Sequence, residues 1–164
     1  MTTIDAADLR QRGFEGFVPF SELPATTVPN TPGIYAILRQ DPTPPVFLET
    51  SPGGRFKGKD PSALLPTLEA RWVPDAQIVY IGMAGAGATR SRGLKKRLDK
   101  FRRFGADEAV GHWVGRHIWQ LADHGELLVA WRPLDGEDPA GEETKLLAGF
   151  MAIHGLLPFA NLRR

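Results

Sequence analysis

Two short apolar runs in this chain have the length and the neighbours of buried β-strands. The first, at residues 33–38, reads Gly-Ile-Tyr-Ala-Ile-Leu after a proline, and the second, at 78–83, reads Ile-Val-Tyr-Ile-Gly-Met. Short apolar runs bounded by turn-forming or polar residues are typical of strands in the interior of a sheet. A third run of this kind lies at 126–132. The pattern therefore predicts a sheet of three strands.

Helical periodicity follows the second run. Leu94, Leu98 and Phe101 recur at i, i+4 and i+7, which predicts an amphipathic helix over residues 89–103. A further helix is expected at 112–122. Its inward-facing residues would be Trp113, Val114, His117, Ile118 and Leu121.

The last helix has clear signals at both ends. Asp138 followed by Pro139 is a typical opening, because aspartate accepts hydrogen bonds from free N–H groups and proline fits the first turn. Gly155 is a typical stop. Two shorter helices are expected at 5–12 and within 61–72. Three strands with these helices predict an α+β fold, in which a small antiparallel sheet is flanked by helices.

The chain of 164 residues fits one domain. Residues 1–32 form an N-terminal extension, and the proline-rich and glycine-rich residues 40–76 form a loop-rich insert between the first two strands. The absence of cysteine excludes disulfides and thiolate metal sites and agrees with a reducing compartment. The N-terminus lacks an apolar stretch, so we expect a cytoplasmic protein without a signal peptide or a membrane span. The oligomeric state stays open.

Positive charge is concentrated on the helix predicted at 89–103. Residues 90–103 carry eight cations and one acid, a net charge of +7, whereas the whole chain carries +1 and the remainder therefore −6. A basic patch on an acidic body suits a polyanion, although a solvated helix face is the usual meaning of a charge run. The residues expected to contact phosphates are Arg90, Arg92, Lys95, Lys96, Lys100 and Arg103. His112 and Arg116 are further candidates, although a half-buried histidine beside Trp113 is an equally good interpretation of His112.

Glu143 lies on the apolar face of the last helix, because apolar residues follow it at i+3, i+4 and i+7. Its neighbour Glu142 falls on another face, which we expect to point to solvent. A carboxylate on an apolar face is unfavourable unless it is paired or bound to a cation. Two interpretations stay open: an ion pair, for which Arg97 is the candidate partner, or a ligand for a divalent cation such as Mg²⁺.

Each of the first two strands carries a tyrosine, and either one alone would be a core residue with its hydroxyl hydrogen-bonded. Together with later residues they form an ordered pattern. A Gly-Ile-Tyr ends at Tyr35, a Tyr-Ile-Gly begins at Tyr80, a Leu-x-x-Arg ends at Arg97, Glu143 lies on the last helix, and a Pro-x-x-Asn ends at Asn161. This order resembles the GIY-YIG nuclease superfamily over roughly residues 33–163, the insert excepted.

The resemblance implies an endonuclease that hydrolyses phosphodiester bonds in nucleic acid, with one Mg²⁺ or Mn²⁺ ion held by Glu143. DNA is the expected substrate, and RNA stays open. It implies that Tyr35 accepts a proton from the attacking water, that Tyr80 positions water or phosphate, and that Arg97 stabilises charge on phosphorus. Asn161 would fix the last segment against the site. As a base near neutral pH, Tyr35 would need a pKa about 2–3 units below its ordinary value.

Two other functions are compatible with these residues. The first is a catalytically inactive nucleic-acid-binding module with the same fold. Met83 favours it, because it stands where the family often has a basic residue, three positions after the second motif tyrosine. The second is a protein whose basic helix binds an acidic partner other than nucleic acid.

Overall fold

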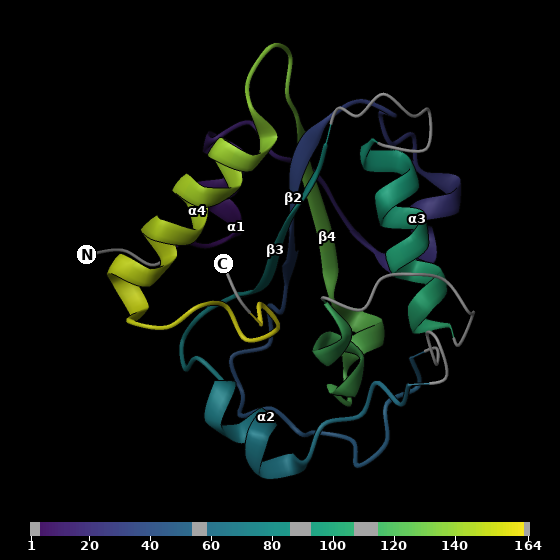
Figure 1. Cartoon of the computed structure of the whole chain (residues 1–164), viewed down its shortest axis with the longest axis vertical. Helices are drawn as coiled ribbons and strands as arrows, with labels where there is room; N and C mark the ends of the chain where they lie inside the picture. The colour runs from purple at the N-terminus through teal and green to yellow at the C-terminus, as the bar shows by residue number, and fades with distance from the viewer. Residues whose placement is uncertain (1–3, 54–58, 86–92, 107–114, 163–164) are drawn as a thin grey trace.

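The computed structural model describes residues 4–53, 59–85, 93–106 and 115–162. Within these residues, an antiparallel sheet of four strands lies at the centre in the order β1-β4-β2-β3 (Figure 1). The strands are β1 (Glu15–Pro19), β2 (Gly33–Leu38), β3 (Ile78–Ala84) and β4 (Leu128–Pro133). The α+β class is confirmed, but the prediction of three strands is wrong, because β1 adds a fourth.

The additional strand has an irregular sequence and geometry, which explains why no apolar pattern predicted it. β1 reads Glu-Gly-Phe-Val-Pro, and a bulge separates Gly16 from Val18 where it pairs with β4. Phe17, at the bulge, has a φ of 60°, which is unusual for an aromatic residue. Bulges and prolines are typical of sheet edges. A β-carbon at Gly16 would collide with the ring of Trp131, so β1 lies directly over that tryptophan.

The described helices surround this sheet. The α-helices are α1 (Ala6–Gln11), α2 (Leu65–Arg71), α3 (Leu94–Gly105) and α4 (Pro139–His154), and the 3-10 helices are η1 (Phe20–Ala25), η3 (Arg116–Gln120) and η4 (His124–Glu126). The α-helix predicted at 112–122 is wrong in its described part, where η3 forms instead, and Trp113 and Val114 lie outside the described residues. No helix among the described residues is long and apolar enough to span a bilayer.

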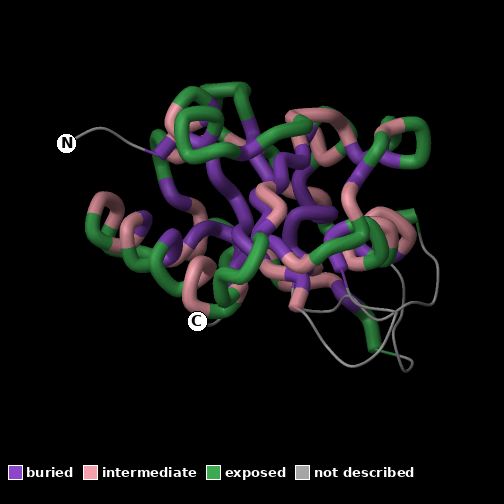
Figure 2. Tube along the Cα trace, turned by 90° about the horizontal axis from the view of Figure 1, so that it is seen from above, coloured by how far each residue is buried: buried purple, intermediate pink, exposed green. Residues whose placement is uncertain are grey.

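Helices cover both faces of the sheet, with α3 on one side and α4 and α1 on the other (Figure 1). Side chains alternate along a strand, so Tyr35 and Ile37 of β2 point toward α3 whereas Ile34 and Ala36 point toward α4. Figure 2 shows the buried residues running through the middle of the molecule, with exposed residues on its outer parts. The face toward α3 holds both motif tyrosines.

The segment between β2 and β3 is attached to the rest of the domain through Gln120 of η3. The fully buried Gln120 side chain donates from Nε2 to the carbonyl oxygens of Leu48 (3.0 Å) and Ala63 (2.8 Å). Its Oε1 accepts from the Ala63 N–H at 2.7 Å, and the Leu48 N–H donates to the Gln120 carbonyl oxygen at 2.7 Å. Leu68 of α2 is buried in the core. The described residues of the predicted insert are thus packed against the domain.

Candidate active site

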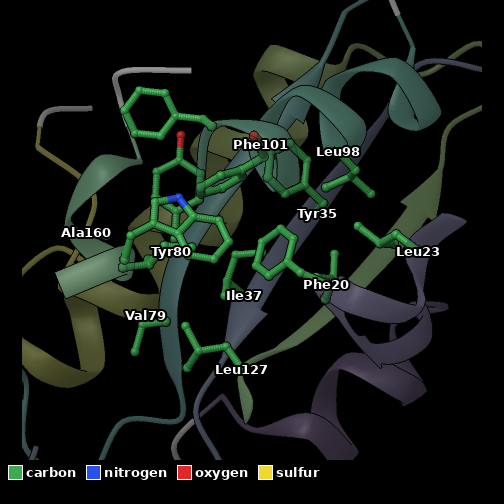
Figure 3. Close-up of a cluster of buried hydrophobic side chains, with 14 of the residues drawn as sticks. Phe20, Leu23, Tyr35, Ile37, Val79, Tyr80, Leu98, Phe101, Leu127 and Ala160 are labelled. Atoms are coloured by element: carbon green, nitrogen blue, oxygen red, sulfur yellow. The ribbon is translucent and has the colours of Figure 1, made fainter. Parts of the chain in front are cut away.

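The two motif tyrosines lie against each other on the α3 face of the sheet. β2 and β3 pair so that Tyr35 lies opposite Gly82 and Tyr80 opposite Ile37. The ring centroids of Tyr35 and Tyr80 are 6.1 Å apart, and the ring of Phe101 packs against both, at 6.3 and 5.5 Å (Figure 3). Tyr35 has no exposed surface and Tyr80 retains 5%. Phe101, expected only as a core residue, is therefore part of the immediate surroundings of both phenols.

Arg97 approaches the two phenols from α3. It lies between the buried Leu94 and Leu98, at the margin of the apolar face, and is half-buried. Its guanidinium hydrogen-bonds the Tyr35 hydroxyl and interacts electrostatically with Tyr80. Its Nε is buried and has no hydrogen-bond partner in the described structure. Arg97 thus lies close to both tyrosines.

Glu143 belongs to α4, which covers the other face of the sheet. It is half-buried, and its charge acts on Tyr35, Tyr80 and Arg97. Within the described parts of the chain it forms neither an ion pair nor a side-chain hydrogen bond, so the direct pair with Arg97 is not found. Burial raises the pKa of Glu143, and the attraction of Arg97 offsets that shift only in part.

The neighbouring Glu142 has different surroundings, because its carboxylate takes part in surface ion pairs. Its carboxylate lies 3.2 Å from Lys145 Nζ and 3.6 Å from Arg132 Nη2, and its side chain is 22% exposed. Arg132 also pairs with Glu137 at 2.7 Å. Glu142 therefore belongs to a group of surface ion pairs, whereas Glu143 is the carboxylate near the phenols.

Burial determines the protonation of both tyrosines. It raises the pKa of Tyr35, and Arg97, the next largest influence, reverses that rise only in part. Burial and the neighbouring Tyr35 raise the pKa of Tyr80 well above its ordinary value. Both phenols are therefore protonated at neutral pH. The pKa shift of Tyr35 is opposite to the one that a base near neutral pH would need, and its role as the base stays a prediction.

Asn161 binds the backbone of β3 beside Tyr80. Its Oδ1 accepts a hydrogen bond from the Ile81 N–H at 2.9 Å, and its Nδ2 donates to the Ile81 carbonyl oxygen at 2.8 Å. The N–H of Ala160 donates to the Val79 carbonyl oxygen at 2.8 Å. β3 is the outer strand of the sheet, so this segment covers its free edge. These contacts agree with the expected anchoring role.

A groove of about 530 Å³ runs along α3, between the helix and residues 23–30. Among its described lining residues, Asp99 is the only acid, and it pairs with Arg102 at 2.8 Å. The groove is therefore positively charged. The predicted phosphate contacts that line it are Lys95, Lys96, Lys100 and Arg103.

The remaining predicted phosphate contacts are Arg90, Arg92, His112 and Arg116. Arg90, Arg92 and His112 lie outside the described residues. Arg116 begins η3, where it interacts with Arg71 at the end of α2. Sequence reasoning did not single out Arg71, because nothing local relates it to a residue so far along the chain.

A metal ion would find few protein ligands among the described residues. No group of three or more His, Asp or Glu side chains there is arranged to hold a metal ion. Mg²⁺ is nevertheless often bound through one or two carboxylates together with water and substrate phosphate oxygens. The half-buried carboxylate of Glu143, which has no direct partner among the described residues, fits this second mode.

Comparisons of the chain with models of protein families, with curated proteins and with solved structures found no match. The function is therefore proposed from the residues of the site itself.

Proposed function

We propose that this protein is a metal-dependent phosphodiesterase that cuts nucleic acid, an endonuclease of the GIY-YIG type, with DNA as the expected substrate. One observation carries the proposal. Two phenols, a guanidinium and a carboxylate, from β2, β3, α3 and α4, interact with one another at one place. A guanidinium is complementary to a phosphate and a carboxylate to a divalent cation.

Arg97 would bind the phosphate that is cut. Its guanidinium is held by Tyr35, and its Nε–H has no partner in the described structure. A planar guanidinium donates two parallel hydrogen bonds to phosphate oxygens, which a lysine does not. Because this charge lies in a partly water-excluded place, it would stabilise the negative charge that develops during hydrolysis more strongly than it would in water.

Glu143 would hold the divalent ion, Mg²⁺ or Mn²⁺, which when bound activates water and neutralises phosphate charge. Burial raises the pKa of this carboxylate, so its ionised form is less stable here than in water, and a bound cation would stabilise it. Arg97 is close enough to attract Glu143 but does not pair with it directly. The carboxylate therefore stays available to a cation while the guanidinium stays available to a phosphate.

The tyrosines would act as protonated hydrogen-bonding groups. Tyr35 is fully buried and holds the Arg97 guanidinium, so we assign it as a positioning residue. Tyr80 retains a small exposed surface beside it, and its protonated hydroxyl would orient water or a phosphate oxygen. The cationic groove along α3 would bind the neighbouring phosphates of the strand through Lys96 and Lys100.

A plasmid-nicking experiment tests this function. Supercoiled DNA is incubated with the purified protein in Mg²⁺, in Mn²⁺ and in EDTA. We expect nicked and linear products only when a divalent ion is present. The same incubation with single-stranded RNA tests the preference for DNA. No cleavage of any nucleic acid with either metal would reject the proposal.

A catalytically inactive binding module is the second candidate, and two observations favour it. The phenol of Tyr35 is fully buried with a raised pKa. Met83, at the position where the resemblance leads one to expect a basic residue, packs against the hydrophobic core on the α4 side of the sheet. Salt-sensitive DNA binding without metal-dependent cleavage would support this candidate. Absence of nucleic-acid binding would contradict both candidates.

A further inference from the structure

Two arginines from distant parts of the chain lie close to each other beside η3. Arg71 is the last residue of α2, and Arg116 is the first residue of η3. Both are half-buried, and the positive charge of Arg71, after burial, lowers the pKa of Arg116. In the described part of the chain, no acidic side chain forms an ion pair with Arg71. The fold therefore concentrates positive charge at this point.

His117, which follows Arg116 in η3, has a ring nitrogen without a hydrogen-bond partner among the described residues. The residue is only 4% exposed, and its Nδ1 is buried without a hydrogen-bond partner in the described structure. Burial first, then Arg116 and Arg71, lower the pKa of His117 to about 4, so the imidazole is neutral at pH 7. Buried polar atoms are nearly always hydrogen-bonded, and an exception calls for a bound group or a functional reason.

Contacts of the neighbouring residues hold this region together. Trp72, next to Arg71, packs against Phe159 with ring centroids 5.3 Å apart, and His117 packs against the same phenylalanine at 6.3 Å. Gln120, on the same 3-10 helix as Arg116, is hydrogen-bonded to both backbone groups of Ala63, which precedes α2. These contacts hold α2 and η3 close together, and with them the two arginines.

We propose that Arg71, Arg116 and His117 form a second phosphate-binding site, built jointly by the insert and η3. The guanidinium groups would donate to phosphate oxygens, and His117 would supply a further hydrogen bond through Nδ1. This inference rests on the proposed function and extends it: the site binds a backbone phosphate of the nucleic acid away from the one that is cut. Phe159 contacts His117 while Asn161 binds β3 beside Tyr80, so the two sites are neighbours along one segment.

The first test is a titration of the protein with inorganic phosphate at pH 7 without metal. Binding is detected through changes in the NMR signals of the histidine side chains. We expect a saturable shift of the His117 signal that chloride at equal ionic strength does not produce. Arg71→Gln and Arg116→Gln should each weaken phosphate binding by about tenfold or more, the effect of losing a charge-assisted hydrogen bond. Arg12→Gln is the matched control, because Arg12 pairs with Asp8 at the surface beside α1.

A second measurement identifies where the phosphate comes from. Wild-type protein and the Arg71→Gln variant are titrated with a short DNA duplex in EDTA at several salt concentrations. The variant should show a salt slope that is smaller by about one, because one phosphate contact is lost. An unchanged slope together with phosphate binding would overturn the nucleic-acid assignment in favour of a small phosphorylated ligand.

The absence of any His117 response to phosphate would overturn the site itself. Phosphate binding that survives in both arginine variants would do the same. Arg71 lies at the end of a helix and is only half-buried, so Arg71→Gln should fold. The site can therefore still be tested if Arg116→Gln does not fold. Neither measurement requires cleavage. A protein that binds phosphate here but cuts no nucleic acid would therefore contradict only the proposed nuclease activity.

Discussion

A β-carbon on Gly82 would lie 2.5 Å from the hydroxyl oxygen of Tyr35 and 2.5 Å from its Cζ. The two residues are cross-strand partners, so the tyrosine ring lies in the space that the glycine leaves free. The same buried phenol interacts with Arg97. Gly82 of the second motif and Tyr35 of the first motif are thus in direct steric contact.

Gly82→Ala should therefore lower the free energy of unfolding by about 1–3 kcal/mol, the usual effect of overpacking a well-filled core. It should also reduce cleavage, because a displaced Tyr35 no longer holds Arg97 in place. Urea denaturation measures the first effect. Gly125→Ala is the control, since a β-carbon there meets no atom within 4 Å. Equal stability of the two variants would contradict the steric fit.

Glu143→Gln should abolish metal-dependent cleavage, with a loss of roughly two orders of magnitude or more, because it removes the proposed anionic ligand of the cation. Glu142→Gln should cleave at nearly the wild-type rate, since Glu142 pairs with Lys145 and Arg132. Initial rates of plasmid nicking at saturating Mg²⁺ compare the two variants. Comparable activity of the Glu143 variant and wild type would remove the metal assignment.

The same substitution should not destabilise the fold. Burial raises the pKa of Glu143, so the folded protein binds a proton here more readily than the unfolded chain, and ionised Glu143 opposes folding at neutral pH. Glu143→Gln should therefore have a higher melting temperature than wild type at pH 7 when metal is absent. The difference should shrink as the pH falls through the raised pKa and vanish below the ordinary carboxyl pKa. A destabilised variant at pH 7 would show that Glu143 has a stabilising partner.

Asn161→Ala should lower the free energy of unfolding by about 2–3 kcal/mol, because it leaves the buried N–H and C=O of Ile81 without the partners that Asn161 supplies. The cleavage rate of the folded fraction should change little, because Asn161 anchors a segment and does not react. Thermal melts and nicking assays well below the melting temperature separate the two effects. The exposed Gln40→Ala is the control for stability. A large loss of cleavage at unchanged stability would give Asn161 a direct part in the reaction.

His117 should make stability dependent on pH. Its pKa in the folded state is about 4, below the ordinary value of 6.5, so the unfolded chain binds more protons between these values. The stability that the folded state gains by keeping His117 neutral is fully present above pH 6.5, and it is lost as the pH falls toward 4. Urea denaturation at pH 7 and pH 5 should therefore show a larger fall in stability for wild type than for His117→Phe. An imidazole NMR titration with a midpoint near 6.5 would contradict this expectation.

The strands that carry the tyrosines and the helices α3 and α4 could be predicted because their signals are local. The apolar runs give β2 and β3, the spacing of Leu94 and Leu98 gives α3, and Asp138 caps α4 by accepting from the Ala140 N–H. These features depend on neighbours within a few residues.

Features that depend on distant neighbours could not be predicted. β1 forms because its backbone fits over Trp131, and no local pattern reveals that contact. The raised pKa of Tyr35 depends on how completely other elements bury the phenol, which the sequence does not state. Glu142 binds Arg132 from β4 and therefore differs from a free surface carboxylate. In each case the deciding partner lies on another element.

The cover that Ala160 and Asn161 provide for β3 has a consequence for handling the protein. An outer strand with unpaired N–H and C=O groups is a template on which another chain can add a strand. Here the carboxamide of one asparagine occupies those groups at Ile81. A truncation that removes residues 158–164 would therefore expose the edge of β3. Such a fragment should self-associate or precipitate during purification.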